Sequence, residues 1–243
     1  MSKVILITGA STGLGAETAK VLAPDNNIII HYNRSKDAAG KVAQEVKENG
    51  GKPFLVQADL TTEQACTAMI EKIKGSFSKL DVLVNNAGGE VERQDIRNLT
   101  WKSLLDTFSL NTFSTMKISS LCINLLEKSI DPLIVNITTV AIRHGSQDSI
   151  AYGASKGAID VFTRGLAQTL APKIRVNAVA PGVISTPLVK KYCPPEKIKE
   201  IIEATPIQRI GESYHIASTI KFIIENNFIT GETIDVNGGL FMR

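Results

Sequence analysis

Seven short apolar runs, rich in β-branched residues, recur along the chain and are separated by amphipathic stretches. Most of these runs are continuous rather than alternating with polar residues, which is typical of strands that are covered on both faces. The predicted strands are Val4–Ile7, Asn27–Tyr32, Pro53–Gln57, Leu80–Val84, Leu133–Ile137, Ile174–Ala178 and Thr233–Val236. Apolar residues at helical spacing predict helices between them. The predicted helices are Leu14–Leu22, Ala38–Lys47, Glu63–Phe77, Trp101–Glu127, Tyr152–Ala171 and Tyr214–Glu225.

Alternation of strands and helices favours right-handed crossovers and therefore a parallel sheet. We predict an α/β fold with a doubly wound, seven-stranded parallel sheet and helices on both faces. No linker, internal repeat or low-complexity tract is present, so residues 1–243 are expected to form a single domain. The exception to this regularity is Thr186–Arg209, which carries four prolines. A long segment of this kind is expected to be a substrate flap rather than a core element.

Composition excludes several classes of protein. Hydrophobic residues make up 43% of the chain and charged residues 21%, and the net charge is +3 without any basic block, so no nucleic-acid partner is expected. The three cysteines are far apart and show no metal-ligand spacing, which favours a reducing compartment and no metal site. The first apolar run is too short for a signal peptide, and none reaches the roughly 18 residues of a membrane span. We therefore expect a cytoplasmic protein without a membrane partner.

A glycine-rich turn follows the first predicted strand and opens a helix. Such a turn brings backbone amides and the positive end of the helix close to a pyrophosphate, as in a dinucleotide-binding Rossmann domain. The spacing is Gly-x-x-x-Gly-x-Gly, which by itself also fits an ordinary tight turn, but its position after the first strand favours the binding function. The predicted cofactor-binding residues here are Gly9, Ser11, Thr12, Gly13, Leu14 and Gly15.

The residues after the second strand bear on the choice of dinucleotide. NAD(H) is usually held by a carboxylate about 20 residues past the glycines. Here that region contains Asn33, Arg34 and Ser35, and no acidic residue comes before Asp37. Because a guanidinium can bind a phosphate dianion through two hydrogen bonds, Arg34 favours NADP(H) over NAD(H). The alternative is an arginine that is simply solvated.

Six motifs occur in the order typical of the short-chain dehydrogenase/reductase family, which this sequence resembles from about Lys3 to Met242. They are Thr8-Gly9-x3-Gly13-x-Gly15, Asp59-Leu60, Asn85-Asn86-Ala87-Gly88, Tyr152-x3-Lys156, Pro181-Gly182-Val183-Ile184-x-Thr186 and Asp235-Val236-Asn237-Gly238-Gly239. The resemblance implies that Asp59 and Leu60 contact the adenine. It implies further that Asn86, Ala87 and Gly88 line the cofactor, and that Pro181, Gly182, Ile184 and Thr186 surround the nicotinamide carboxamide. Taken without the resemblance, the sequence Asn85–Gly88 also fits an ordinary turn after a strand.

Tyr152 and Lys156 are four residues apart and so share one face of a helix. A nearby ammonium favours the phenolate, so the pKa of Tyr152 is expected to fall toward working pH. The resemblance implies that Tyr152 donates a proton to a carbonyl oxygen while the nicotinamide delivers hydride, and that Lys156 also holds the ribose. It further implies that Asn111 completes a water relay to the lysine.

A hydroxyl that fixes the substrate oxygen is expected 13 residues before Tyr152, where Thr139 stands. The family usually has serine at this place. Thr139 keeps a hydroxyl that can donate and accept, while its methyl group restricts χ1. Because charge develops on the substrate oxygen in the transition state, this donor should matter for catalysis. We therefore predict a working active site with a variant hydroxyl.

The substrate is the least determined feature. Length and motif spacing resemble 3-oxoacyl-carrier-protein reductases, which favours a 3-oxoacyl thioester or a small ketone. Glucose-type sugar dehydrogenases are an alternative. Pteridine reductases are another, although Gly13 and Thr139 differ from the arginine and aspartate typical of that group. A dinucleotide-sensing regulator is the non-enzymatic alternative, since fold does not imply function. Glu90 and Arg143 are candidate pocket residues, and the family resemblance implies a homodimer or homotetramer.

Overall fold

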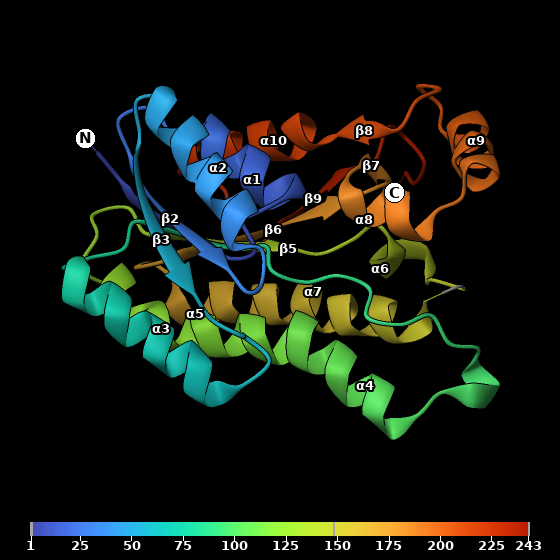
Figure 1. Cartoon of the computed structure of the whole chain (residues 1–243), viewed down its shortest axis with the longest axis horizontal. Coiled ribbons are helices and arrows are strands. Elements are labelled where there is room, and N and C mark those ends of the chain that lie inside the picture. Colours follow the sequence, from blue (N-terminus) through green and yellow to red (C-terminus); the bar gives the residue numbers. More distant parts are fainter. Residues whose placement is uncertain (1, 148, 243) are drawn as a thin grey trace.

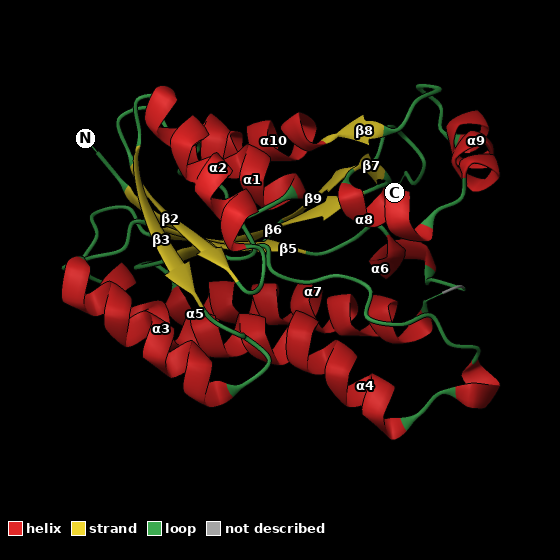
Figure 2. Cartoon of the chain, in the orientation of Figure 1, coloured by secondary structure: helices red, strands yellow, loops and turns green. Residues whose placement is uncertain are grey.

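The computed structural model describes residues 2–147 and 149–242; Met1, Asp148 and Arg243, which the predicted range 1–243 includes, lie outside the described residues. Seven parallel strands form one sheet in the order β3-β2-β1-β4-β5-β6-β9, which confirms the predicted doubly wound α/β fold. The strands of this sheet are β1 (Val4–Ile7), β2 (Asn27–Tyr32), β3 (Lys52–Gln57), β4 (Val82–Asn85), β5 (Leu133–Ile137), β6 (Arg175–Pro181) and β9 (Thr233–Val236). Figures 1 and 2 show the sheet between two layers of helices.

The continuous apolar runs arise because neighbouring residues of one strand enter different cores. Ile5 and Ile7 pack in the cluster beneath α1, α2 and α10, whereas Leu6 packs on the other face with α3, α5 and α7. Burying both faces removes nearly all of the side-chain surface of these strands from water. The helices are α1 (Gly13–Val21), α2 (Lys36–Glu48), α3 (Glu63–Ser76), α4 (Trp101–Phe108), α5 (Ser114–Leu126), α6 (Ala141–His144), α7 (Ile150–Leu170), α8 (Pro187–Tyr192), α9 (Pro195–Ala204) and α10 (Ser213–Glu225). Among the described residues, none of these helices is both long enough and apolar enough to cross a bilayer.

The prediction of one continuous helix at Trp101–Glu127 is wrong for the middle of that range. A π-helical turn, η2 (Ser109–Phe113), separates α4 from α5, and a short 3-10 turn, η1 (Ile96–Asn98), precedes α4. The Asn111 side chain donates 3.0 Å to the backbone oxygen of Thr107, the carbonyl that the Asn111 N–H would take in a regular α-helix. This competition explains the wider turn, and π-turns of this kind are frequent at functional sites.

The 186–209 segment is more regular than its prolines predict. Pro187 and Pro195 each stand at the start of a helix, α8 and α9, where their missing N–H has no helical partner to lose. Two short parallel strands, β7 (Ile184–Ser185) and β8 (Gly211–Glu212), pair with each other and tie the two ends of the segment together. Figure 1 places this segment at the end of the sheet toward which β6 and β9 point.

Candidate active site

The candidate residues gather where the strands end. In the order of the sheet, β1 lies between β2 and β4, so the crossovers leave β1 in opposite directions and open a crevice at the carboxyl edge. Three predicted groups of residues lie directly after β1, β2 and β3, and three more follow β4, β5 and β6. The fold therefore brings together residues that are far apart in the sequence, such as Gly13 and Thr186, which are 186 − 13 = 173 positions apart.

The glycine turn packs against the loop after β4. A Cβ on Gly15 would lie 2.5 Å from Asn86 Nδ2 and 2.6 Å from the Gly9 oxygen, so only glycine fits. Asn86 Nδ2 donates to the backbone oxygens of Thr8 (2.8 Å) and Gly9 (3.1 Å). The Thr8 hydroxyl accepts from the backbone nitrogens of Asn86 and Ala87, both at 2.9 Å. These bonds join Asn86 and Ala87 to the glycine turn.

The amino end of α1 is open to an anion. The Thr12 side chain, at its N-cap, makes no capping hydrogen bond within the described structure, and the first turn has no acidic residue. Gly13 has φ +57°, and a Cβ there would meet nothing nearer than Thr186 at 3.7 Å. Free helical N–H groups with the positive end of the helix dipole suit a pyrophosphate. The residues present thus fit a dinucleotide.

His31, which the sequence analysis did not assign to the site, supports the same turn. It is buried at the end of β2; its Nδ1 accepts from the Gly9 N–H at 2.9 Å, while Nε2 lies 3.1 Å from the Ala58 oxygen. Burial lowers the pKa of His31, which keeps the ring neutral and able to accept at Nδ1. A polar residue within an otherwise apolar strand was the only sequence signal for this role.

Arg34 and Asp59 lie near each other, just after β2 and β3. Arg34 is exposed after β2, and its charge helps to lower the pKa of Asp59, although hydrogen bonds from Thr61 lower it more. The Thr61 hydroxyl donates to Asp59 Oδ1 at 2.8 Å, so this carboxylate is partly occupied by its own turn. Ser35 stands at the N-cap of α2. A side-chain hydrogen bond with Asn33 also helps to lower the pKa of Asp59. The exposed guanidinium is the available cation at this position.

Five of the predicted cofactor contacts offer less to a cofactor than the motifs imply, because they are buried, tightly packed or hydrogen-bonded within the fold. Leu60 and Ile184 are 5% and 4% exposed, so only their backbone can face a cofactor. Pro181 is the last residue of β6, and a Cβ on Gly182 would lie 2.8 Å from Asn237. The Thr186 hydroxyl caps α8 by accepting from the Val189 N–H at 3.3 Å.

Tyr152 and Lys156 lie on α7 with their functional groups at the same crevice. Lys156 is buried, and its Nζ donates to the Ile137 oxygen at 2.8 Å. Burial lowers the pKa of Lys156 to about 8. The expected fall in the pKa of Tyr152 is wrong for this structure: burial, with the nearby negative charge of Glu90, raises it to about 12, and side-chain hydrogen bonding with Thr139 opposes the rise. Tyr152 is therefore a neutral phenol near pH 7.

Asn111 holds the loop after β4 through two hydrogen bonds to the backbone of Gly89. Its Oδ1 accepts from the Gly89 N–H at 2.8 Å, and its Nδ2 donates to the Gly89 oxygen at 2.9 Å. A Cβ on Gly88 would lie 2.5 Å from Asn111 Oδ1 and 3.0 Å from Lys156 Nζ. Gly88, Asn111 and Lys156 thus meet at one point, and the π-turn places Asn111 there.

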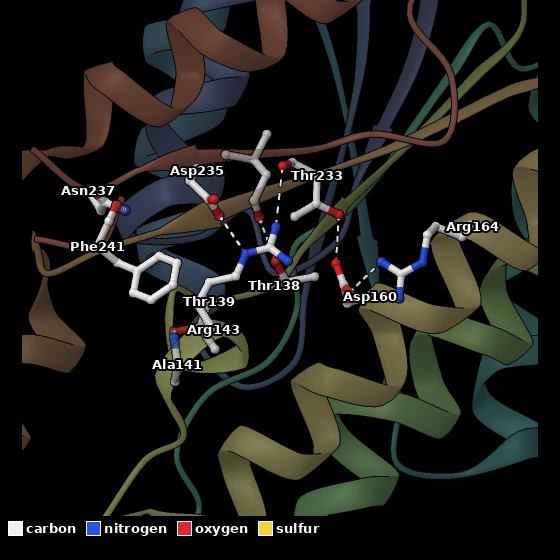
Figure 3. Close-up of polar contacts among 11 residues, drawn as sticks. Thr138, Thr139, Ala141, Arg143, Asp160, Arg164, Thr233, Asp235, Asn237 and Phe241 are labelled. Carbon is white, nitrogen blue, oxygen red and sulfur yellow. Dashed lines mark hydrogen bonds and ion pairs between the residues drawn. The ribbon is translucent and has the colours of Figure 1, made fainter. Parts of the chain in front are cut away.

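Thr139 lies at the end of β5, on a turn that is anchored behind the site. Its hydroxyl oxygen accepts from the Ala141 N–H at 3.3 Å, which leaves the hydroxyl proton free to donate. Figure 3 shows Arg143, on α6, pairing with Asp235 of β9 at 3.2 Å. Arg143 is 14% exposed, so it is neither a solvated loop residue nor a free anion-binding group. The neighbouring Thr138 differs from Thr139, because its hydroxyl donates to the Val179 oxygen inside the fold.

A doubly wound sheet with a glycine turn at its switch point is the architecture of dinucleotide-binding α/β proteins. The family model described as short chain dehydrogenase matches residues 3–197. The 3-oxoacyl-[acyl-carrier-protein] reductase of Synechocystis sp. is 34% identical over 248 residues, covering 99% of this chain and 98% of that protein. The chain therefore belongs to the short-chain dehydrogenase family and is an oxidoreductase.

Two solved structures resemble this chain along almost its whole length. Angucycline C-6 ketoreductase LanV with bound NADP has a TM-score of 0.90 and 28% identity, covering 98% of this chain and 95% of that one. The 7α-hydroxysteroid dehydrogenase complexed with NADH and 7-oxo glycochenodeoxycholic acid has a TM-score of 0.92 and 32% identity, covering 98% and 93%. Because the two hold different dinucleotides, the choice of dinucleotide must be argued from this chain's own residues.

Proposed function

We propose that this protein is an NADP(H)-dependent oxidoreductase that interconverts a carbonyl and a secondary alcohol, with reduction of a 3-oxoacyl thioester or a small ketone as its leading reaction. The observation that carries the proposal is the meeting of Tyr152, Thr139 and Lys156 beside a glycine turn that suits a dinucleotide. The similarity to a 3-oxoacyl-carrier-protein reductase supports this choice of substrate.

In the proposed mechanism the bound nicotinamide supplies the hydride, and the chain's own residues manage the proton. Tyr152 is protonated near neutral pH and donates its proton to the substrate oxygen. The free hydroxyl proton of Thr139 donates to the same oxygen as negative charge develops there. The Lys156 ammonium stabilises the phenolate that forms when Tyr152 has given up its proton. Asn111, by fixing Gly89, keeps the loop beside Lys156 in place.

The direct test of this function is loss of NADPH absorbance with an acetoacetyl thioester, with NADH in a parallel reaction. NADPH-preferring turnover is the expected result. Absence of turnover with thioesters and simple ketones, together with turnover of sugars or pteridines, would overturn the leading reaction. The assignment to the oxidoreductases would still stand.

The Arg34→Asp variant is expected to bind NADPH about 10- to 100-fold more weakly and NADH more tightly, because it replaces a charge-assisted phosphate contact by a carboxylate. Cofactor fluorescence titration measures both affinities. Lys41→Asp makes the same charge change at an exposed position of α2 and should leave both affinities nearly unchanged. Unaltered affinities in the Arg34 variant would show that this arginine is merely solvated.

The rate of reduction is expected to fall as pH rises through about 8, the pKa to which burial lowers Lys156. Below that pH the ammonium is charged and stabilises the phenolate; above it the neutral amine cannot, so kcat/KM should drop by up to about tenfold per pH unit. The measurement is kcat/KM for a ketone at saturating NADPH from pH 6 to 10. A flat profile over that range would contradict the role of Lys156.

We also propose that the protein assembles as a homodimer or homotetramer through the region of α4 and α5, and that the 186–209 segment acts as the substrate flap. Trp101 is 75% exposed and Phe113 is 52% exposed, although both are apolar.

Cys66 and Cys122 are buried and all three cysteines are free, which is compatible with the expected reducing compartment.

A further inference from the structure

Glu90 has a carboxylate oxygen that the fold buries and leaves without a partner. The side chain is only 8% exposed, and Oε1 has no hydrogen-bond partner among the described residues. The other oxygen, Oε2, accepts from Arg93 Nε at 2.9 Å. Buried polar atoms in proteins are nearly always paired, so an orphaned acceptor indicates a missing donor.

Glu90 lies on a loop that an active-site side chain holds in place. Glu90 directly follows Gly89, whose backbone nitrogen and oxygen are both held by the side chain of Asn111. The charge of Glu90 is near enough to Tyr152 to raise the pKa of the phenol. Glu90 therefore belongs to the space beside the proton donor.

The 186–209 segment packs against the loop that carries Glu90. A Cβ on Gly89 would lie 3.5 Å from Leu188 Cδ1, so α8 packs against the loop that carries Glu90. The Arg93 guanidinium lies 5.7 Å from the centre of the Tyr192 ring. The loop of Glu90 is thus near both the proton donor and the segment proposed to cover the substrate.

We propose that Glu90 determines substrate specificity: its Oε1 accepts a hydrogen bond from a hydroxyl or N–H group that the substrate carries near its reacting carbonyl. This inference rests on the proposed function and, among the small ketones of that proposal, favours those that carry such a donor. A site with a buried acceptor discriminates strongly against an analogue that lacks the donor, because the acceptor is then desolvated without a partner. A plain alkyl ketone is accordingly a poorer substrate than the ketone of the same size that carries a hydroxyl group.

The test compares matched ketones: hydroxyacetone with butanone, and 4-hydroxy-2-butanone with 2-pentanone. The wild-type protein should favour the hydroxylated member of at least one pair by about 10²-fold in kcat/KM with NADPH. Glu90→Ala should remove most of that preference, while Glu90→Gln, whose amide oxygen still accepts, should keep part of it. Glu92→Gln is the matched control, because Glu92 is exposed and its carboxylate accepts a hydrogen bond from the Gln94 side chain.

A second measurement distinguishes a role of Glu90 in substrate recognition from a purely structural role of Glu90. Removing the negative charge beside Tyr152 should lower the pKa of the phenol, so the pH profile for alcohol oxidation should move to lower pH in Glu90→Gln and not in Glu92→Gln. Binding of NADPH and the melting temperature should change little in either variant.

The outcomes separate the two proposals. Equal turnover of both members of each pair by the wild-type protein, or a preference that survives in Glu90→Ala, would overturn the role of Glu90 and leave the proposed function standing. Absence of turnover with every ketone and with the acetoacetyl thioester would overturn both.

Discussion

The Tyr152→Phe variant is expected to reduce carbonyl substrates about 10³-fold more slowly than the wild-type protein, because it removes the general acid. The ring is retained, so packing around α7 and the affinity for NADPH should change little. Since Tyr152 is a neutral phenol near pH 7, the loss should appear in kcat for reduction across neutral pH. Steady-state kinetics with a ketone and NADPH measure it.

Tyr214→Phe is the control for this substitution, because Tyr214 lies on α10 and is 56% exposed. It should keep wild-type kinetics. Turnover by Tyr152→Phe within about tenfold of the wild-type rate would show that another group supplies the proton, since general acids contribute roughly 10² or more.

The Thr139→Val variant is expected to lose about 10²-fold or more in kcat, whereas Thr139→Ser should retain most of the activity. Valine keeps the branched shape and removes the hydroxyl, so the change isolates the donated hydrogen bond. The Thr139 oxygen already accepts from Ala141, which directs its proton outward toward the substrate and Tyr152. The ratio of the two variants' kcat values is the informative quantity.

Thr138→Val provides a neighbouring comparison, since the Thr138 hydroxyl donates to the Val179 oxygen inside the fold. It should lower the melting temperature and leave kcat per folded molecule close to that of the wild-type protein. Near-normal turnover in Thr139→Val would exclude Thr139 from catalysis and direct attention to another hydroxyl.

Much of the fold could be predicted because its determinants are local. Continuous apolar strands such as Asn27–Tyr32 can be stable only between two covered faces, and the structure has this strand with the same bounds. The π-turn at Asn111 could not be predicted from apolar spacing, because one side-chain hydrogen bond to the residue four positions earlier creates it. The prolines of the 186–209 segment were misleading for a similar reason: a proline at the first position of a helix begins it instead of breaking it.

The candidate site was predictable to the extent that motifs specify backbone positions. The glycine turn, Tyr152 and Lys156 are recognisable by spacing, and the fold brings them together. The raised pKa of Tyr152 could not be predicted from the sequence. Spacing identifies Lys156 as a neighbour but gives no information on burial or on the charge of Glu90. Contacts also distinguish Arg143, which pairs with Asp235, from Glu90, which keeps an oxygen without a hydrogen-bond partner among the described residues. Both follow active-site motifs closely, and only their contacts assign them to different roles.

The most direct test of the central claim is the mass of the alcohol formed when the protein reduces a ketone with NADPH that carries two deuterium atoms at C4 of the nicotinamide. Hydride transfer to the carbonyl predicts one deuterium on the carbinol carbon of the product and none in a reaction with unlabelled NADPH. An alcohol without deuterium, or no alcohol at all although NADPH binds, would contradict the account.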